Sequence, residues 1–188
     1  MHEQLKQILT YVSSFSNNEL DEIAGCFRPR SVKRNAILLS EGAVCREFYV
    51  VCKGCIRLYY LAQNGEEKTR YIMPDNYIGT ALTSFISQKP SFEVIDAPEE
   101  TELLCISHTD FYRLNNDMAN WKVFYQKILE MAYTYQTRRI ESMVTLSAAQ
   151  RYQQLLQEDP ALVQRLSNKV LASFLDIRQE TLSRIKSK

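Results

Sequence analysis

The last residues of the chain, 166–188, carry the pattern that most restricts its fold. Their sequence is LSNKVLASFLDIRQETLSRIKSK. Apolar or small residues recur with helical spacing on both sides of a short gap, at Leu171, Ala172, Leu175, Ile177, Leu182 and Ile185. Asp176 lies in the gap, and its short polar side chain tolerates the left-handed conformation of a tight turn. Ala172 is small enough to let two helices cross closely. The segment therefore predicts a helix-turn-helix.

A helix-turn-helix commonly lays its second helix in the DNA major groove. The candidates for contacts with base edges are Arg178, Gln179, Glu180 and Arg184. Arginine suits guanine, glutamine suits adenine, and glutamate accepts from cytosine. The candidates for phosphate contacts are Thr181, Ser183, Lys186, Lys188, Ser167 and Lys169. A generic pair of amphipathic helices at a protein interface is the alternative interpretation of the same pattern.

The run Gln179 to Ile185, QETLSRI, resembles the recognition helix of the Crp/Fnr (catabolite-activator) family of transcription regulators. Two positions depart from the family pattern. Asp176 stands where the turn commonly has glycine, and Arg178 stands where the helix often begins with Ser or Thr. Because an N-cap oxygen contributes about 1 kcal/mol, we expect this helix end to be frayed until a DNA phosphate binds it.

Between about residues 28 and 108, the sequence has the pattern of several short strands separated by turns. We expect strands at 36–39, 47–52, 55–61, 67–73 and 102–107. Asn64-Gly65 between two of them predicts a hairpin with a type I′ turn, which needs positive φ at both central residues. Several short strands at intervals of roughly ten residues indicate an antiparallel roll or barrel.

These strands resemble the β-roll of cyclic-nucleotide-binding domains. The resemblance runs through Glu41-Gly42, residues 48–51, Lys53-Gly54 and residues 75–79, with glycines at the turns. It implies an α+β fold: an N-terminal antiparallel β-roll, a long dimerisation helix and a C-terminal helix-turn-helix domain of winged-helix-like type. The expected division is a sensor domain at 1–117, the dimerisation helix at 118–146 and the DNA-binding domain at 147–188.

The resemblance also points to an effector pocket, although its key residues differ from those of nucleotide-binding relatives. Thr80 stands where those relatives have a glutamate for the ribose, and Pro90 or Ser91 stands where they have an arginine for the cyclic phosphate. The nearby Lys89 cannot replace a bidentate guanidinium. We therefore expect no ordinary binding of cyclic AMP; the pocket either takes another small molecule or is filled by packing. The candidate lining is Gly79, Thr80, Ala81, Leu82, Ser91, Phe92, Gln136 and Thr137.

The remainder of the chain has helical patterns. Expected helices are 3–13, 18–27 with Asn17 or Asn18 as its cap, 111–114 followed by a cap at 115–117, 118–146, and 148–158 after Ser147. Pro160 ends the last of these and opens a link, 161–165, which is short for a two-stranded wing.

The helix expected at 118–146 is too long for a small roll to cover. About 29 residues make a rod of roughly 43 Å. In the Crp/Fnr family the partner is the same helix of a second subunit, so we expect a homodimer that a charge at Ile128 or Leu129 would disrupt. The alternative is a helix buried entirely against its own roll.

Charge and composition fit these expectations. Residues 138–188 carry nine Lys and Arg against five Asp and Glu, whereas residues 1–137 carry fourteen against seventeen. A positive C-terminal segment suits a DNA-binding end. With no basic-then-apolar leader and no apolar run of roughly 20 residues, we expect a cytoplasmic protein without a membrane partner.

Other function classes have weaker support in the sequence. The five cysteines include Cys52 and Cys55. The interpretations of these two residues are a redox pair, half a metal site or small packing residues, and we favour packing. Only His2 and His108 are available for a metal-dependent enzyme, and no nucleophile or phosphate-loop motif is present, so we expect no enzyme, metal or cofactor. A small-molecule-binding or protein-interaction module without DNA binding is the remaining alternative. The expected partners are double-stranded DNA, a second copy of the chain, RNA polymerase and an unidentified effector.

Overall fold

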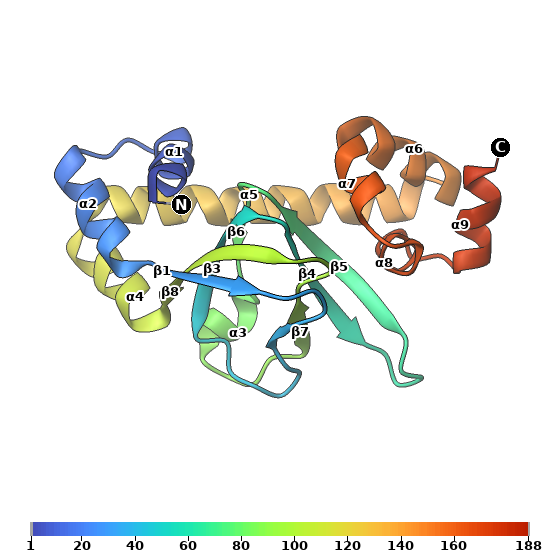
Figure 1. Cartoon of the computed structure of the whole chain (residues 1–188), viewed down its shortest axis with the longest axis horizontal. Helices are drawn as coiled ribbons and strands as arrows, with labels where there is room; N and C mark the ends of the chain where they lie inside the picture. Colours follow the sequence, from blue (N-terminus) through green and yellow to red (C-terminus); the bar gives the residue numbers. More distant parts are fainter. Residues whose placement is uncertain (1, 188) are drawn as a thin grey trace.

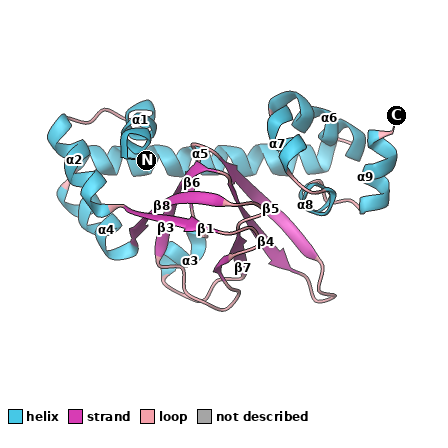
Figure 2. Ribbon diagram, viewed as in Figure 1, coloured by secondary structure: helices cyan, strands magenta, loops and turns pink. Residues whose placement is uncertain are grey.

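The computed structural model describes residues 2–187. Two antiparallel four-stranded sheets form the roll, and a long helix runs past them to a group of four short helices at the C-terminal end (Figures 1 and 2). One sheet has the strand order β1-β8-β3-β6 and the other has the order β2-β7-β4-β5. The strands are β1 Arg28–Val32, β2 Ile37–Leu39, β3 Glu47–Lys53, β4 Cys55–Leu61, β5 Glu67–Pro74, β6 Ile78–Gly79, β7 Glu93–Asp96 and β8 Thr101–Ser107.

The five predicted strands are confirmed, and β1, β6 and β7 were missed. β1 and β7 lack a simple apolar pattern, since β1 reads RPRSV and β7 reads EVID. All four residues of β7 are nevertheless buried. Its two carboxylates are compensated there by arginines, Glu93 by Arg70 and Asp96 by Arg57. Because ion pairs across the sheet allow these carboxylates to be buried, β7 lacks the apolar pattern from which a buried strand is usually predicted.

The hairpin between β4 and β5 is confirmed, but its predicted type I′ turn is wrong. Gly65 has a φ of 80°, whereas Asn64 has negative φ. The side-chain oxygen of Asn64 accepts a hydrogen bond from the Glu66 amide at 3.1 Å, and the Gly65 amide donates to Ala62 O at 2.8 Å. A longer loop with one left-handed glycine therefore connects the strands.

The four helices before the long one are α1 His2–Val12, α2 Asn17–Cys26, α3 Leu82–Ser87 and α4 His108–Asp117. Of these, α1, α2 and α4 lie together at one end of the roll, and α3 lies between β6 and β7 in the sequence (Figure 1). The cap of α2 is Ser16, not Asn17 or Asn18, because Ser16 and Glu19 form a reciprocal capping box. The expected cap at 115–117 is also wrong: those residues belong to α4, and Met118 precedes the next helix without a side-chain cap.

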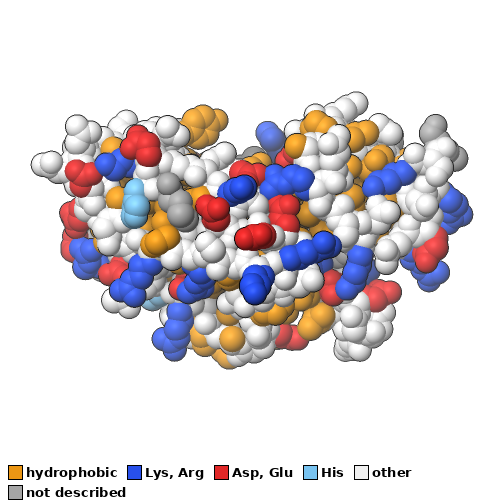
Figure 3. Space-filling view, viewed as in Figure 1, with side chains coloured by type: hydrophobic (Ala, Val, Ile, Leu, Met, Phe, Trp, Pro, Cys, Tyr) orange, Lys and Arg blue, Asp and Glu red, His pale blue; other side chains and the backbone are white. Residues whose placement is uncertain are grey.

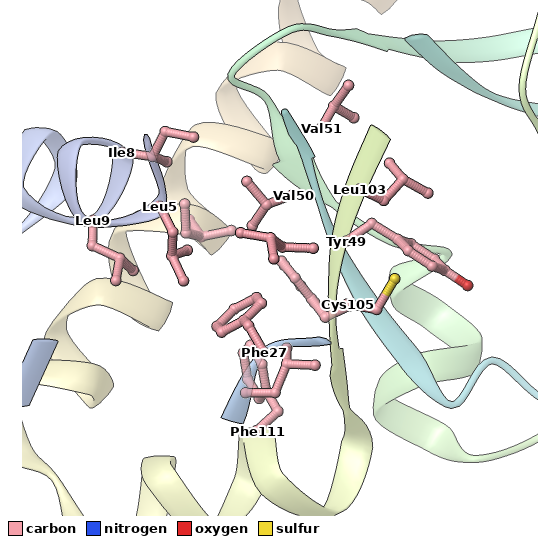
Figure 4. Close-up of a cluster of buried hydrophobic side chains, with 14 of the residues drawn as sticks. Leu5, Ile8, Leu9, Phe27, Tyr49, Val50, Val51, Leu103, Cys105 and Phe111 are labelled. Atoms are coloured by element: carbon pink, nitrogen blue, oxygen red, sulfur yellow. The ribbon is translucent and has the colours of Figure 1, made fainter. Parts of the chain in front are cut away.

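The main core lies between the sheets and these helices. Leu5 and Leu9 of α1 reach toward strand residues such as Val50, and Phe27 and Phe111 lie below them (Figure 4). The long helix α5, Ala119–Thr145, adds Trp121, Phe124 and Ile128 to the same core.

The far half of α5 is different, since it carries apolar side chains on its surface. Tyr133, Ile140 and Val144 are 76%, 63% and 79% exposed, and with half-buried Leu129 they follow one face of the helix. Ile128 instead is only 6% exposed and belongs to the roll core. It therefore cannot serve as a probe of dimerisation, contrary to our expectation, because a charge there would disrupt the subunit itself.

The C-terminal helices are α6 Ala148–Glu158, α7 Pro160–Arg165, α8 Asn168–Phe174 and α9 Gln179–Lys186. Ser147 caps α6 as predicted. The expected link at 161–165 is wrong: proline at the first position and Asp159 as cap begin a further helix, α7. No helix within residues 2–187 has the length and apolar character needed to cross a membrane.

Candidate nucleic-acid interface

The two helices expected at the C-terminal end are present with the predicted turn. Ser167 caps α8, with its hydroxyl accepting from the Val170 amide at 3.3 Å. Asp176 adopts a φ of 52°, and the Ile177 amide donates to Ala172 O at 3.0 Å across the turn. Ala172 is buried against the second helix, as its size predicted. Residues 168–186 therefore form a helix-turn-helix.

Helix α9 has one buried side and one polar exposed side. Leu182 is fully buried, and Thr181 and Ile185 are half-buried. The exposed residues are Arg178, Gln179, Glu180, Ser183, Arg184 and Lys186. This list contains all four candidates for base contacts, so the helix presents them to solvent together. Lys188, another candidate, lies outside the described residues.

The beginning of α9 has backbone amides that no cap side chain satisfies. Arg178 occupies the N-cap position, and its side chain makes no capping hydrogen bond. The first N–H groups of a helix carry partial positive charge and suit an anion. The start of α9 can therefore accept a phosphate oxygen, whereas Ser167 already uses its hydroxyl as the cap of α8.

The candidate lysines Lys186 and Lys169 have hydrogen-bond partners in different parts of the molecule. Lys186 Nζ lies 2.7 Å from Asn168 Oδ1, within the helix-turn-helix. Lys169 Nζ instead lies 2.6 Å from Glu67 Oε1 on β5. Arg184 makes only long contacts, at 3.4 and 3.5 Å, with Glu180 O and Thr181 Oγ1 of its own helix. Arg184 and Lys186 are thus available to DNA, whereas Lys169 has a partner on the roll. Figure 3 shows basic and acidic side chains close together over this end of the molecule.

Sequence reading missed that the helix-turn-helix is docked on the roll. Ser173 of α8 accepts from the Thr69 amide at 2.9 Å, lies 2.8 Å from the Thr69 hydroxyl and donates to Glu67 O at 2.6 Å. Lys68 Nζ lies 2.9 Å from the carboxylate of Asp176 in the turn. The outer face of β4–β5 also gives apolar contacts, since Cys55 and Ile72 share a buried cluster with residues of α6 to α9.

Two arginines complete this docking surface. Arg165 at the end of α7 pairs with Asp75 and Glu99 of the roll and donates to Gly54 O at 2.8 Å. Arg139 of α5 donates to Thr69 O at 3.0 Å and to Phe174 O at 2.6 Å, and its guanidinium lies 4.2 Å from the centre of the Phe174 ring. Burial lowers the pKa of Arg139 from its usual value. Arg139 therefore joins the long helix, the roll and the end of α8.

The residues expected to line an effector pocket differ in their exposure and in their hydrogen bonds. Phe92 is 79% exposed, whereas Ala81 is fully buried. The Thr80 hydroxyl donates to Glu47 O at 2.7 Å and contacts the Cys45 thiol at 2.9 Å. The Ser91 hydroxyl accepts from the Glu93 amide and donates to Glu93 O. The polar groups of Thr80 and Ser91 are therefore engaged by the roll itself. Gly79 is the last residue of β6, and Leu82 is the first residue of α3.

The face of the roll on which the effector pocket was expected carries an ion pair between Glu93 and Arg70. Glu93 and Ile95 of β7 point to the same side of the sheet, and Ile95 belongs to the roll core. Glu93 is buried and bound to Arg70. Nearby, the rings of Tyr71 and Tyr135 lie 4.5 Å apart and join β5 to α5. Next to Tyr135 on the helix, Gln136 is half-buried and Thr137 is exposed.

The cysteines are free and mostly buried. Cys52 packs in the roll core, whereas Cys55 packs beneath the helix-turn-helix domain. Burial raises the pKa of both thiols, which disfavours the reactive thiolate. This environment supports the packing interpretation over a redox pair.

Comparison with known proteins agrees with this architecture. Residues 29–117 match the family model described as cyclic nucleotide-binding domain. No curated protein sequence matches the chain.

Several solved structures superpose on most of the chain. A protein assigned to the Crp/Fnr family of transcriptional regulators, from Eubacterium rectale, superposes with a TM-score of 0.73 at 21% identity, covering 91% of this chain and 82% of its own. FixK2 from Bradyrhizobium japonicum gives 0.74 at 16% identity, with coverage of 86% and 83%. The catabolite activator protein of Thermus thermophilus gives 0.61 at 19% identity, with coverage of 96% and 85%. The chain thus has the same fold as these structures, and the segment that matches the cyclic nucleotide-binding family model contains most of the roll.

Proposed function

We propose that the protein is a homodimeric, DNA-binding transcription regulator of the Crp/Fnr type that does not respond to cyclic AMP. The observation that carries the proposal is α9: it is anchored by Leu182 and exposes Arg178, Gln179, Glu180 and Arg184 together. These four side chains can all form specific hydrogen bonds with base edges. Lys186, Ser183 and the free amides at the start of α9 supply phosphate contacts on the same helix.

The dimer rests on the second half of α5. Solvent-exposed apolar side chains at Tyr133, Ile140 and Val144 recur with the spacing of a helix–helix contact. A second copy of α5 would cover this stripe and bring two helix-turn-helix units together. In this proposal residues 1–117 are the sensor, 118–146 the dimerisation helix and 147–188 the DNA-binding domain.

Selection of duplexes from a random pool, followed by gel-shift titration, tests the function. Two recognition helices related by a dimer axis should select a near-palindromic site with half-sites about one helical turn, roughly 34 Å, apart. Sedimentation of the complex should show two chains per duplex. Selection that enriches no sequence, with no binding above that of a scrambled duplex, would reject the proposal.

The same experiment distinguishes a DNA-binding regulator from the main alternative. A small-molecule-binding or protein-interaction module without DNA binding would bind neither the pool nor any enriched duplex. As a regulator the protein would act in the cytoplasm, with RNA polymerase and an unidentified small-molecule effector as further partners. Affinity for the selected duplex, measured with and without candidate metabolites, would reveal such an effector.

A further inference from the structure

The β4–β5 hairpin extends from the roll, and its strand β5 passes beside α8 (Figure 1). Three consecutive residues at the start of β5 make the contacts. Glu67 binds Lys169, Lys68 binds Asp176, and Thr69 binds Ser173. All three partners belong to α8 or to the turn before α9, so the hairpin contacts the element that would orient the recognition helix.

A groove of about 710 Å³ separates the hairpin from the recognition helix. One wall consists of residues 64–68 and the other includes residues 176–180, the turn and the start of α9. The hairpin wall carries the carboxylates of Glu66 and Glu67. The groove also contains Lys68 and Lys169, and each is paired with a glutamate of the hairpin, Lys68 with Glu66 at 3.6 Å and Lys169 with Glu67 at 2.6 Å. A DNA phosphate approaching the free amides of α9 would therefore enter a groove whose lysines are already bound by carboxylates of the hairpin.

Lys169 provides the second argument. It is a candidate phosphate contact, yet its ammonium is bound by Glu67 at 2.6 Å. Glu67 is shared with Arg57, whose guanidinium lies 2.8 Å from its other oxygen. If Lys169 moves away from Glu67, Glu67 remains paired with Arg57. Release of Lys169 therefore does not leave a partly buried carboxylate without a cationic partner. DNA and the hairpin compete for the same lysine.

We propose that the β4–β5 hairpin is an autoinhibitory latch, which holds the helix-turn-helix in a docked position and must release it before DNA binds tightly. The inference rests on the proposed function. The ionic contacts suit a reversible device because Lys68, Asp176 and Lys169 are about half exposed or more, where ion pairs stabilise little. The apparent affinity for DNA then equals the intrinsic affinity reduced by the fraction of undocked protein.

A reversible crosslink tests the latch directly. The hydroxyl oxygens of Thr69 and Ser173 lie 2.8 Å apart, so the double variant Thr69→Cys, Ser173→Cys brings two thiols within reach of a disulfide. Oxidation should lower affinity for the selected duplex at least about tenfold, and dithiothreitol should restore it. The wild type and both single variants, treated identically, control for the five native cysteines.

The outcomes of the crosslink are distinct. Equal binding by the oxidised and reduced double variant, with the disulfide verified by mass spectrometry, would show that the docked form is competent for DNA and overturn the latch. Failure of the disulfide to form would also count against it, because the two residues would then not be neighbours in solution. Absence of DNA binding by reduced wild type is a failure of the proposed function instead.

The direction in which the DNA affinity changes after removal of one charge gives an independent test. Lys68→Ala removes the partner of Asp176 and should tighten DNA binding about two- to fivefold. A lysine that contacted DNA would give the opposite sign, since its loss weakens binding. Lys33→Ala, an equal charge change at an exposed residue after β1, should leave the affinity unchanged. Weaker or unchanged binding by Lys68→Ala would contradict the latch.

Discussion

In the proposed function, Arg184 is the residue best placed to read a base. It lies on the exposed side of α9, one turn after Glu180, and within residues 2–187 its guanidinium makes only contacts of 3.4 and 3.5 Å. Arg184→Ala should cost about 1–3 kcal/mol on the selected operator and relax the preference at one base pair. The measurement compares Kd values for the operator and for a scrambled duplex. Equal losses on both duplexes would reassign Arg184 to phosphate contact.

Lys186→Ala is the matched control for Arg184→Ala, because it removes one positive charge from the same helix. It should weaken binding to every sequence alike and lower the slope of log K against log salt by about one. Its bond to Asn168 is exposed, so the variant should fold normally.

The sequence predicted the local features at this scale. Asp176 at the left-handed turn, small Ala172 at the crossing and Ser167 as a cap all depend on neighbours within a few residues. Partnerships across the fold could not be predicted in this way. Arg57 meets Asp96 from 39 residues away, and Lys169 meets Glu67 from 102 residues away. Charge alone does not say which of many acidic residues will be the partner.

At the scale of elements, α5 separates into a buried half and an exposed half, and this division specifies the test of dimerisation. Ile140→Asp places a charge in the exposed apolar stripe and should give monomers that retain the folded roll. Sedimentation velocity at tens of micromolar measures the state, and circular dichroism checks the fold. Thr134→Asp, exposed but off the stripe, is the matched control and should remain dimeric. A monomeric wild type would contradict the role of α5.

The docking of the helix-turn-helix on the roll should depend on pH. Burial opposes ionisation of Glu67 and Asp75, but hydrogen bonds from Lys169 and Arg57 to Glu67, and from Arg165 and the Gly54 amide to Asp75, outweigh it and lower both pKa values. A carboxylate with a lowered pKa stabilises the docked form above its ordinary pKa, and this contribution disappears as the pH falls through the lowered value.

Acidification below about pH 4 should therefore loosen the docked helix-turn-helix before the roll unfolds. The amide resonances of Thr69 and Ser173, followed by NMR during a pH titration, would report the change. Amide resonances of β3 and β8, which lie in the other sheet, serve as the internal control. Resonances of both groups shifting together would show global unfolding instead.

For the whole molecule, the fold does not determine the ligand. The roll retains the architecture of a cyclic nucleotide-binding domain, but Thr80 is bonded internally and Arg70 is paired with Glu93. Calorimetric titration with cyclic AMP should therefore show no binding at micromolar concentrations. A dissociation constant in the micromolar range or tighter would contradict this prediction. The sequence anticipated this departure at Thr80, but it gave no sign of the Arg70–Glu93 pair, which forms only when β5 and β7 are brought together.

Helix α5 runs from the core of the roll to the helix-turn-helix without a proline or glycine among its 27 residues (Figure 1). Kinks in helices usually arise at such residues, so α5 should move as a stiff lever about 40 Å long. A tilt of roughly 5° at one end of a rod of that length displaces the other end by about 3–4 Å. Such a displacement exceeds the tolerance of a hydrogen bond, and Arg139 holds the roll and α8 through bonds of 3.0 and 2.6 Å near the far end. If the protein binds DNA as proposed, repacking around Trp121 at the near end should therefore be magnified into a change in operator affinity.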